Sequence, residues 1–278
     1  MARTEEGIFT SKDNTRLFWR SQLPEGEPTA VVGVVHGYCD HSGRYLHVMN
    51  ALAASGFAVA AFDYRGHGKA EGKRVDVEKW DDFLDDLAVF WGRVRALAPG
   101  KPAFILAHSH GALMTTHWAL KKPEGLTGVV LSSPYYRLAF DPPAFKLAGA
   151  KLLRKILPGV HISNELSVTQ LSRDEAWQKF SAEDPLYEHT TTPRHFFETL
   201  ASQERLIGRG AEFTTPVYMV AGEADGVASM PAMRAFFDTM ASPDKTWKSH
   251  PEFRHEVMNE IGKERVLADI VEWISARR

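Results

Sequence analysis

Short apolar runs, many of them β-branched, alternate with amphipathic segments along most of this 278-residue chain. Runs of this kind are typical of strands that are buried on both faces of a sheet. They predict strands at Val31–Val35, Phe57–Asp63, Ala103–Ala107, Gly128–Leu131 and Val217–Ala221, and a short strand at Lys245–Lys248. Apolar residues at helical spacing predict helices over Tyr45–Ser55, Trp80–Leu97, Ala112–Leu120, Ala232–Met240 and Lys263–Ala276. Such alternation favours an α/β fold, with a mostly parallel central sheet flanked by helices.

Two segments depart from this alternation. Polar and apolar residues alternate at Gly7–Thr10 and Arg16–Arg20 around Asp13-Asn14, which predicts a hairpin. Between Pro134 and Ser202 there is no buried β run, but Pro-containing turns separate short helical patches. We therefore expect a core made of residues 1–134 and 203–278, with a mainly helical lid inserted as residues 135–202.

The segment around Ser109 carries the clearest chemical signal. A predicted strand enters a predicted helix through Ala107-His108-Ser109-His110-Gly111, which matches the nucleophile-elbow pattern G-x-S-x-G except for alanine at the first glycine. A sharp turn of this kind strains the backbone of the serine and projects its oxygen above the sheet. Ser109 is therefore predicted to be a nucleophile, and the competing interpretation is a serine that only caps the helix.

In folds that carry such an elbow, an acid and then a histidine follow the serine along the chain. Asp225 comes directly after the predicted strand Val217–Ala221, and Glu223 is its nearest competitor. His255 lies on the loop between the last strand and the last helix, and His250 is its rival. We predict a triad of Ser109, Asp225 and His255, in which the imidazole relays the serine proton and the carboxylate orients the imidazole.

Carbonyl chemistry also needs two N–H donors aimed at the oxygen that becomes negative. One is expected to be the backbone N–H of His110, immediately after the nucleophile. The other is assigned to the backbone N–H of Tyr38, because His36-Gly37-Tyr38 follows the strand Val31–Val35 and lets the chain turn over the serine.

Longer motifs extend this pattern over the whole core. They are the decapeptide His36–Tyr45, which reads H-G-x-x-x-H-S-G-R-Y, the segment Asp63–Gly72, the elbow, and His255-Glu256 with Asn259-Glu260. With these motifs the chain resembles the monoacylglycerol lipases and lysophospholipases of the α/β-hydrolase superfamily. It departs from their pattern at Ala107, at His110, where methionine is usual, and at Ala112.

The resemblance implies hydrolysis of the ester that joins one fatty acyl chain to a glycerol or glycerophospho head group. The expected partners are therefore a single-chain lipid and water, and Asp40 and Arg44 are expected to order the loop and the head-group end of the site. Two other functions stay open: an aminopeptidase-like amide hydrolase of the same fold, and a non-catalytic receptor for small molecules.

The segment Phe145–Leu157 predicts an amphipathic helix in the lid, with Lys151, Arg154 and Lys155 opposite its apolar face. This helix either makes transient contact with a membrane surface or packs its apolar face on the core. The formal charge of −2 without a basic run argues against nucleic acid as a partner. Neither a metal site nor a nucleotide cofactor is indicated by any motif. Without a signal-peptide pattern we expect a cytoplasmic protein, peripheral to a membrane at most.

Overall fold

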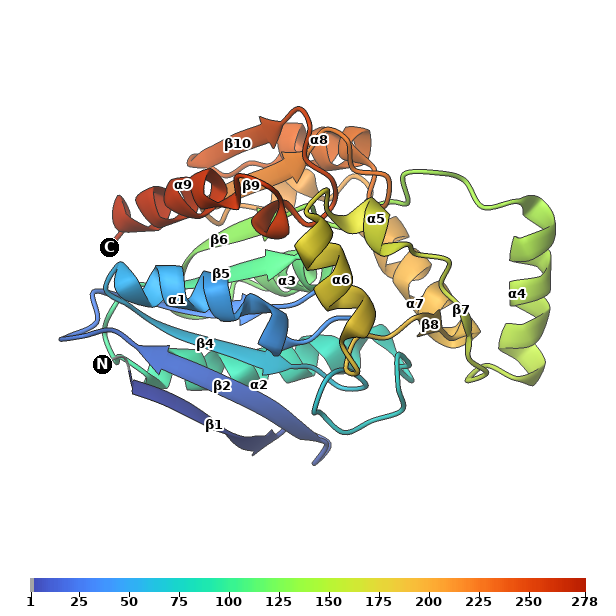
Figure 1. The fold of residues 1–278 in the computed structure, drawn as a ribbon, viewed down its shortest axis with the longest axis horizontal. Coiled ribbons are helices and arrows are strands. Elements are labelled where there is room, and N and C mark those ends of the chain that lie inside the picture. Colours follow the sequence, from blue (N-terminus) through green and yellow to red (C-terminus); the bar gives the residue numbers. More distant parts are fainter. Residues whose placement is uncertain (1–2) are drawn as a thin grey trace.

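The computed structural model describes residues 3–278, which are built around one eight-stranded sheet (Figure 1). The strand order is β1-β2-β4-β3-β5-β6-β9-β10. The first three strands in this order pair antiparallel, and all later neighbours pair parallel. Their bounds are Arg3–Thr10 (β1), Arg16–Leu23 (β2), Phe57–Asp63 (β4), Ala30–Val35 (β3), Ala103–His108 (β5), Leu126–Ser132 (β6), Val217–Gly222 (β9) and Lys245–His250 (β10). The predicted α/β fold with a mostly parallel sheet is confirmed.

Helices cover both faces of the sheet, which is why its central strands are apolar throughout (Figure 1). Every residue of β3, β4 and β5 is buried. The helices α2, α3 and α8 enclose one hydrophobic core, and α1 and α9 enclose the other. Their bounds are Leu46–Ala54 (α1), Trp80–Ala96 (α2), Ser109–Ala119 (α3), Met230–Thr239 (α8) and Lys263–Ser275 (α9).

Three of these helices begin at positions different from those predicted, and one of them, α8, begins at Met230 and not at Ala232. The helix predicted to begin at Tyr45 is preceded by a 3₁₀ turn over Ser42–Tyr45, so α1 begins at Leu46. The helix predicted over Ala112–Leu120 begins three residues earlier, at Ser109 itself. The sharp turn is thus confined to the junction between His108 and Ser109, and the backbone amides at the start of α3 lie directly beside the serine.

Residues 133–216, which we call the insert, connect β6 to β9. Helices make up most of their regular structure, and a two-residue strand pair is the only regular β structure among the described residues of this segment. The elements are α4 (Ala144–Ile156), β7 (Ile162–Ser163), α5 (Val168–Leu171), α6 (Glu175–Glu183), β8 (Thr190–Thr191), α7 (Pro193–Glu204) and a 3₁₀ turn at Gly210–Glu212. That residues 135–202 form a separate lid stays a prediction.

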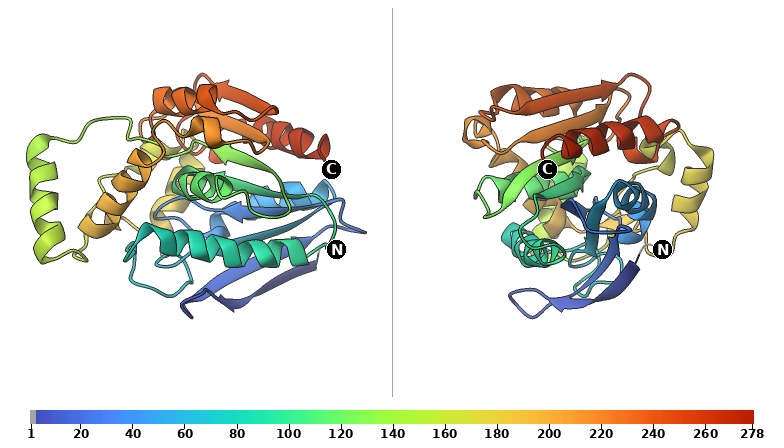
Figure 2. Two further views of the ribbon diagram at one scale, coloured as in Figure 1. Left: turned by 180° about the vertical axis from the view of Figure 1, so that it is seen from behind. Right: turned by 90° about the vertical axis from the view of Figure 1, so that its left-hand side faces the viewer.

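The helix α4 lies at one end of the molecule, where it contacts α7 (Figures 1 and 2). None of its residues is buried, and Phe145, Leu152 and Ile156 are each more than half exposed. The interpretation that this apolar face packs on the core is therefore wrong. Over residues 3–278, helices that combine the length and the apolar character needed to cross a bilayer are absent.

Candidate active site

Ser109 lies at the junction between β5 and α3, in the strained backbone conformation expected of an elbow. Its φ is 52°, in the left-handed region that residues with a side chain rarely adopt. A side chain at Gly111 would collide with the carbonyl oxygens of Val35 and His36, so α3 approaches β3 this closely only because residue 111 is glycine. The strain is thus maintained by tight packing of the helix start against the neighbouring strand.

The three predicted triad residues form one continuous hydrogen-bonded chain. The Ser109 hydroxyl lies 2.8 Å from Nε2 of His255, and Nδ1 of His255 donates to Oδ2 of Asp225 at 2.8 Å. The other oxygen of Asp225 accepts from the backbone amides of Val227 and Ala228, at 2.8 and 2.9 Å. These amides fix the carboxylate, so the imidazole is oriented with its Nε2 lone pair toward the serine.

The rival residues lie elsewhere. Glu223 is exposed and accepts a hydrogen bond from Ser249 at 2.7 Å. The ring of His250 stacks on Phe253, and its Nε2 has no hydrogen-bond partner among the described residues. Neither residue lines the cavity that contains Ser109.

The Asp225 carboxylate next to His255 changes the pKa of the imidazole. Burial lowers the pKa of this imidazole, but the Asp225 carboxylate favours the charged form more strongly, so that the net effect raises the pKa above its ordinary value. The ring is therefore a better proton acceptor than a free imidazole, as a general base for a serine must be.

Both predicted oxyanion donors lie beside the serine. His110 is the second residue of α3, where backbone N–H groups have no partner within the helix. Tyr38 follows Gly37, and a Cβ built on Gly37 would lie 3.4 Å from the Cβ of Ser109. Tyr38, His110 and Ser109 line one cavity together with His255.

The two residues expected at the head-group end are placed differently from one another. Asp40 lines the cavity, but the guanidinium of Arg44 is fully buried and does not line it. Arg44 pairs with Asp40 at 2.8 Å and with Glu256 at 3.0 Å, donates to Ser181 at 2.7 Å, and lies 4.8 Å from the ring of Trp177. Arg44 therefore braces the loop, the insert and the segment after His255, and it is not part of the cavity wall. A contact of Arg44 with a head group stays a prediction.

The cavity has a volume of about 470 Å³, within the range of small-molecule sites. Most of its wall is apolar and comes from the insert. Apolar lining residues include Leu138, Phe140, Leu147, Leu153, Leu166, Phe196, Leu200 and Val227. A long apolar chain bound in this cavity would place the carbonyl group at its end beside Ser109.

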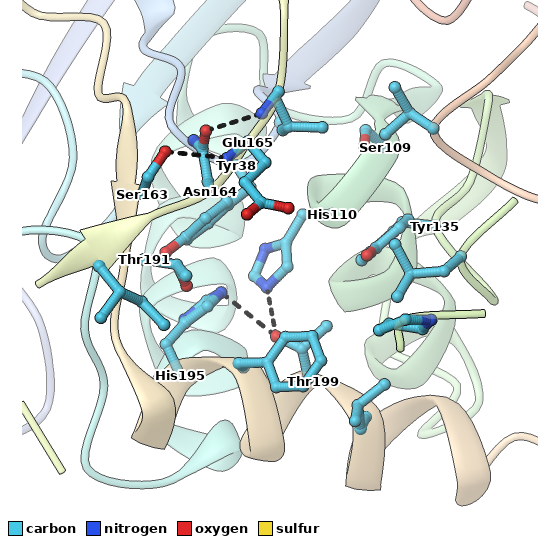
Figure 3. Close-up of a pocket in the computed structure, with 18 of the residues that line it drawn as sticks. Tyr38, Ser109, His110, Tyr135, Ser163, Asn164, Glu165, Thr191, His195 and Thr199 are labelled. Atoms are coloured by element: carbon cyan, nitrogen blue, oxygen red, sulfur yellow. Dashed lines mark hydrogen bonds between the residues drawn. The ribbon is translucent and has the colours of Figure 1, made fainter. Parts of the chain in front are cut away.

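Polar residues of the insert also line the cavity, and no motif in the sequence predicts them. His195 and Thr199 lie on α7 with His110 opposite them, and the hydroxyl of Thr199 lies within 3.4 Å of a ring nitrogen of each histidine (Figure 3). Their spacing of four residues places both on one face of a helix, which the sequence alone indicates. Which face turns toward Ser109 depends on how the insert folds back over the sheet.

Comparison with known proteins places the chain in a family. A family model described as serine aminopeptidase, S33, matches residues 26–262. The monoacylglycerol lipase of Mycolicibacterium smegmatis is 31% identical over 270 residues, which cover 97% of this chain and 96% of that protein. The crystal structure of the monoacylglycerol lipase of Paleococcus ferrophilus is similar over 100% of both chains, with a TM-score of 0.82 and 28% identity. A soluble variant of monoglyceride lipase from Saccharomyces cerevisiae, in complex with a substrate analog, shares the fold with a TM-score of 0.87 and 21% identity, over 99% of this chain and 96% of that one. The chain therefore belongs, as its motifs predict, to the monoacylglycerol lipase family of the α/β-hydrolase superfamily.

Proposed function

We propose that the protein hydrolyses the fatty-acyl ester of monoacylglycerols or lysophospholipids through an acyl intermediate on Ser109. The observation that carries this proposal is the hydrogen-bonded chain from Ser109 through His255 to Asp225, which opens on an apolar cavity. Membership of the family makes the chain a carboxylic ester hydrolase, and the geometry supports the role of each residue in the reaction.

The reaction has two halves. His255 takes the proton of Ser109 as the serine oxygen attacks the ester carbonyl, and the backbone N–H groups of Tyr38 and His110 stabilise the negative oxygen of the tetrahedral intermediate. The imidazolium, stabilised by Asp225, returns the proton to the leaving alcohol. Water activated by His255 then releases the fatty acid and regenerates the serine.

The charges of the cavity favour an acyl ester over an aminoacyl substrate. A site for a substrate amine needs a free carboxylate, but each acidic residue that lines the cavity is paired. Asp40 and Glu256 both bind Arg44, and Glu165 binds Lys146 at 2.7 Å. Each lining carboxylate thus has a cationic partner in the part of the chain that the structure describes.

The exposure of α4 supports contact with a lipid surface. Its apolar residues Phe145, Leu152 and Ile156 are exposed, and Leu147 and Leu153 on another side line the cavity. A helix that shows one apolar side outward and another to the active site can lie on a bilayer and pass a single-chain lipid to Ser109. We place this enzyme in the cytoplasm, at the surface of a membrane.

A substrate panel tests the proposed reaction. Purified protein is assayed with monoacylglycerol, lysophosphatidylcholine, triacylglycerol, a short p-nitrophenyl ester and an aminoacyl p-nitroanilide, with Ser109→Ala as the control. We expect sustained turnover of the single-chain lipids and the short ester, which the Ser109→Ala variant loses by several orders of magnitude. Turnover of the anilide alone would support the aminopeptidase, and stabilisation by ligands without any turnover would support the receptor.

A further inference from the structure

The peptide unit between Gly37 and Tyr38 is held from its carbonyl side by two rings. The hydroxyl of Tyr64 donates to the Gly37 carbonyl oxygen at 2.6 Å, and Nδ1 of His36 donates to the same oxygen at 2.7 Å. The C=O and N–H of a trans peptide point in opposite directions, so donors on the carbonyl fix the direction of the Tyr38 N–H. Among residues 3–278, no acceptor is found for that N–H.

The direction of this peptide matters because the nucleophile is so close. A Cβ built on Gly37 would lie 3.2 Å from the ring of His108 and 3.4 Å from the Cβ of Ser109. A rotation of the peptide plane would therefore move the Tyr38 N–H away from the oxygen that becomes negative during attack. Donors that are fixed before the reaction are worth more than donors that must reorient during it.

Tyr64 and His36 are themselves locked together. Their rings stack with centroids 4.1 Å apart and an angle of 8° between the planes. Because Nδ1 of His36 faces a carbonyl oxygen, it carries the proton, and Nε2 accepts a long hydrogen bond from the Tyr64 backbone at 3.4 Å. Only one tautomer of His36 satisfies both contacts.

A chain of polar groups continues from Tyr64 to α7. The oxygen of Tyr64 lies 3.4 Å from Nδ1 of His110, whose Nε2 lies 3.4 Å from the hydroxyl of Thr199. That hydroxyl lies 3.2 Å from Nε2 of His195 (Figure 3). Since Tyr64 gives its proton to Gly37, every donor in the chain points toward Gly37, and the chain ends at Nδ1 of His195, which has no partner among the described residues.

The protonation of the histidines agrees with this direction. Burial lowers the pKa of His110 well below its ordinary value and that of His195 to about 3, so both rings are neutral and each has one donor and one acceptor. Hydrogen bonds that run in one direction polarise one another, which strengthens the last bond of the chain. Here the last bond is the one from Tyr64 to the carbonyl of Gly37.

We propose that Tyr64 is a positioning residue for ester hydrolysis. Its hydroxyl holds the Gly37–Tyr38 peptide so that the Tyr38 N–H faces the developing oxyanion. Thr199 and His110 in turn orient that hydroxyl. This inference rests on the proposed function, since it concerns the oxyanion donors of the same site. The tyrosine touches neither substrate nor nucleophile and acts only through the peptide.

The variant Tyr64→Phe tests the role directly because it removes one oxygen atom. We expect kcat for the short p-nitrophenyl ester to fall about 10- to 100-fold, with KM within about twofold of wild type. The affinity for an alkyl trifluoromethyl ketone, which forms an oxyanion adduct with Ser109, should fall in parallel. Affinity for a non-hydrolysable monoalkylglycerol ether should not change. The matched control is Tyr218→Phe, because the Tyr218 hydroxyl is also buried but has no hydrogen-bond partner in the described structure.

A double-mutant cycle tests whether Thr199 acts through Tyr64. Thr199→Val alone should lower kcat several-fold, but in the Tyr64→Phe background it should change kcat by less than about twofold. If the two substitutions instead lower kcat by independent factors that multiply, the proposed coupling of Thr199 to Tyr64 is wrong. If kcat of Tyr64→Phe equals that of Tyr218→Phe, the positioning role of Tyr64 is wrong. A wild-type enzyme that is inactive on every ester would instead overturn the proposed function.

Discussion

At the scale of single residues, the protonation of His255 sets the pH range in which Ser109 reacts. The Asp225 carboxylate raises the pKa of His255 above its ordinary value despite burial, which lowers it. Only the neutral ring accepts a proton, so kcat/KM for a short ester should rise with pH through a midpoint above 6.5. Asp225→Asn removes the negative charge, and we expect the midpoint to move to lower pH while kcat falls about 10⁴-fold. A pH–rate profile measures both, and an unchanged midpoint in this variant would contradict the assignment of Asp225.

Loss of Arg44 should destabilise the fold strongly, because it breaks two buried ion pairs. Arg44 lies between the carboxylates of Asp40 and Glu256 with no exposed surface on its side chain. Arg44→Met leaves both carboxylates buried and unpaired, and we expect the free energy of unfolding at pH 7 to fall by about 3–5 kcal/mol in urea denaturation. As a control, Arg16→Met removes a pair with Glu71 in which both side chains are more than half exposed, and it should cost less than about 1 kcal/mol.

The pair of Arg44 and Glu256 also predicts how the stability of the fold changes at acidic pH. Burial raises the pKa of Glu256, but the charge of Arg44, and after it His108 and the hydrogen bonds from Trp177 and Asn259, lower it to about 2. A carboxyl whose folded pKa is depressed stabilises the fold above its ordinary pKa and loses that contribution as pH falls through the folded value. The difference in unfolding free energy between wild type and Arg44→Met should therefore narrow from about pH 4.5 down to about pH 2. A constant difference across this range would show that the charge of Glu256 is not what Arg44 stabilises.

The role of Arg44 also marks where single-residue prediction stops. Ser109, Asp225 and His255 could be predicted because each follows a strand end in a fixed order, and strand ends are visible in the sequence. The partners of Arg44 at Ser181 and Glu256 are 137 and 212 residues away, and nothing local encodes those contacts. Arg44, which belongs to a conspicuous motif, was therefore expected at the head-group end of the site, although its charge pairs with buried carboxylates.

At the scale of elements, the strands and most helices could be predicted, and the start of α3 could not. Continuous apolar runs give β3, β4, β5 and β9 to within a residue or two, since these strands are buried on both faces. The start of α3 was predicted late because the elbow pattern assigns residues 108–111 to the turn between strand and helix. The strand-to-helix turn is held by packing of Gly111 against β3, a tertiary effect.

The exposed helix α4 gives a prediction of its own. If α4 lies on a bilayer, reversing Lys151, Arg154 and Lys155 to Glu should abolish flotation with vesicles that contain anionic lipid. Hydrolysis of a soluble short ester should stay within about twofold of wild type, because none of these residues lines the cavity. Reversal of Lys121, Lys122 and Arg205, three exposed cations outside α4, makes the same change in net charge and should leave flotation intact. Unchanged flotation in the α4 variant would leave this helix without a membrane role.

At the scale of the whole molecule, the insert is joined to the core very unevenly. The later helices are held by buried or partly buried polar contacts: Trp177 on α6 donates to Glu256 at 2.6 Å, and His117 on α3 donates to the backbone of Ser202 on α7 at 2.9 Å. The helix α4 has no buried residue, and its polar contacts with the rest of the insert are partly exposed, such as the ion pair of Arg154 with Glu198. The sequence indicated a lid bounded at 135 and 202 because the strand pattern stops there. Within that range, the contacts join α6 and α7 to the core more firmly than α4.

This uneven attachment predicts that α4 opens alone. Local stability follows buried contacts, so amides of α4 should exchange hydrogen far faster than those of α7, whose protection should approach that of global unfolding. Trypsin under native conditions should cut first at Lys151, Arg154 or Lys155, and the nicked protein should keep α6 and α7 bound to the core. The control sites are Arg93 and Arg95, which lie at the end of α2 on the folded core and should stay uncut. If α4 and α7 exchange at the same rate, the insert moves as one unit, and a rigid lid over residues 135–202 is the better description.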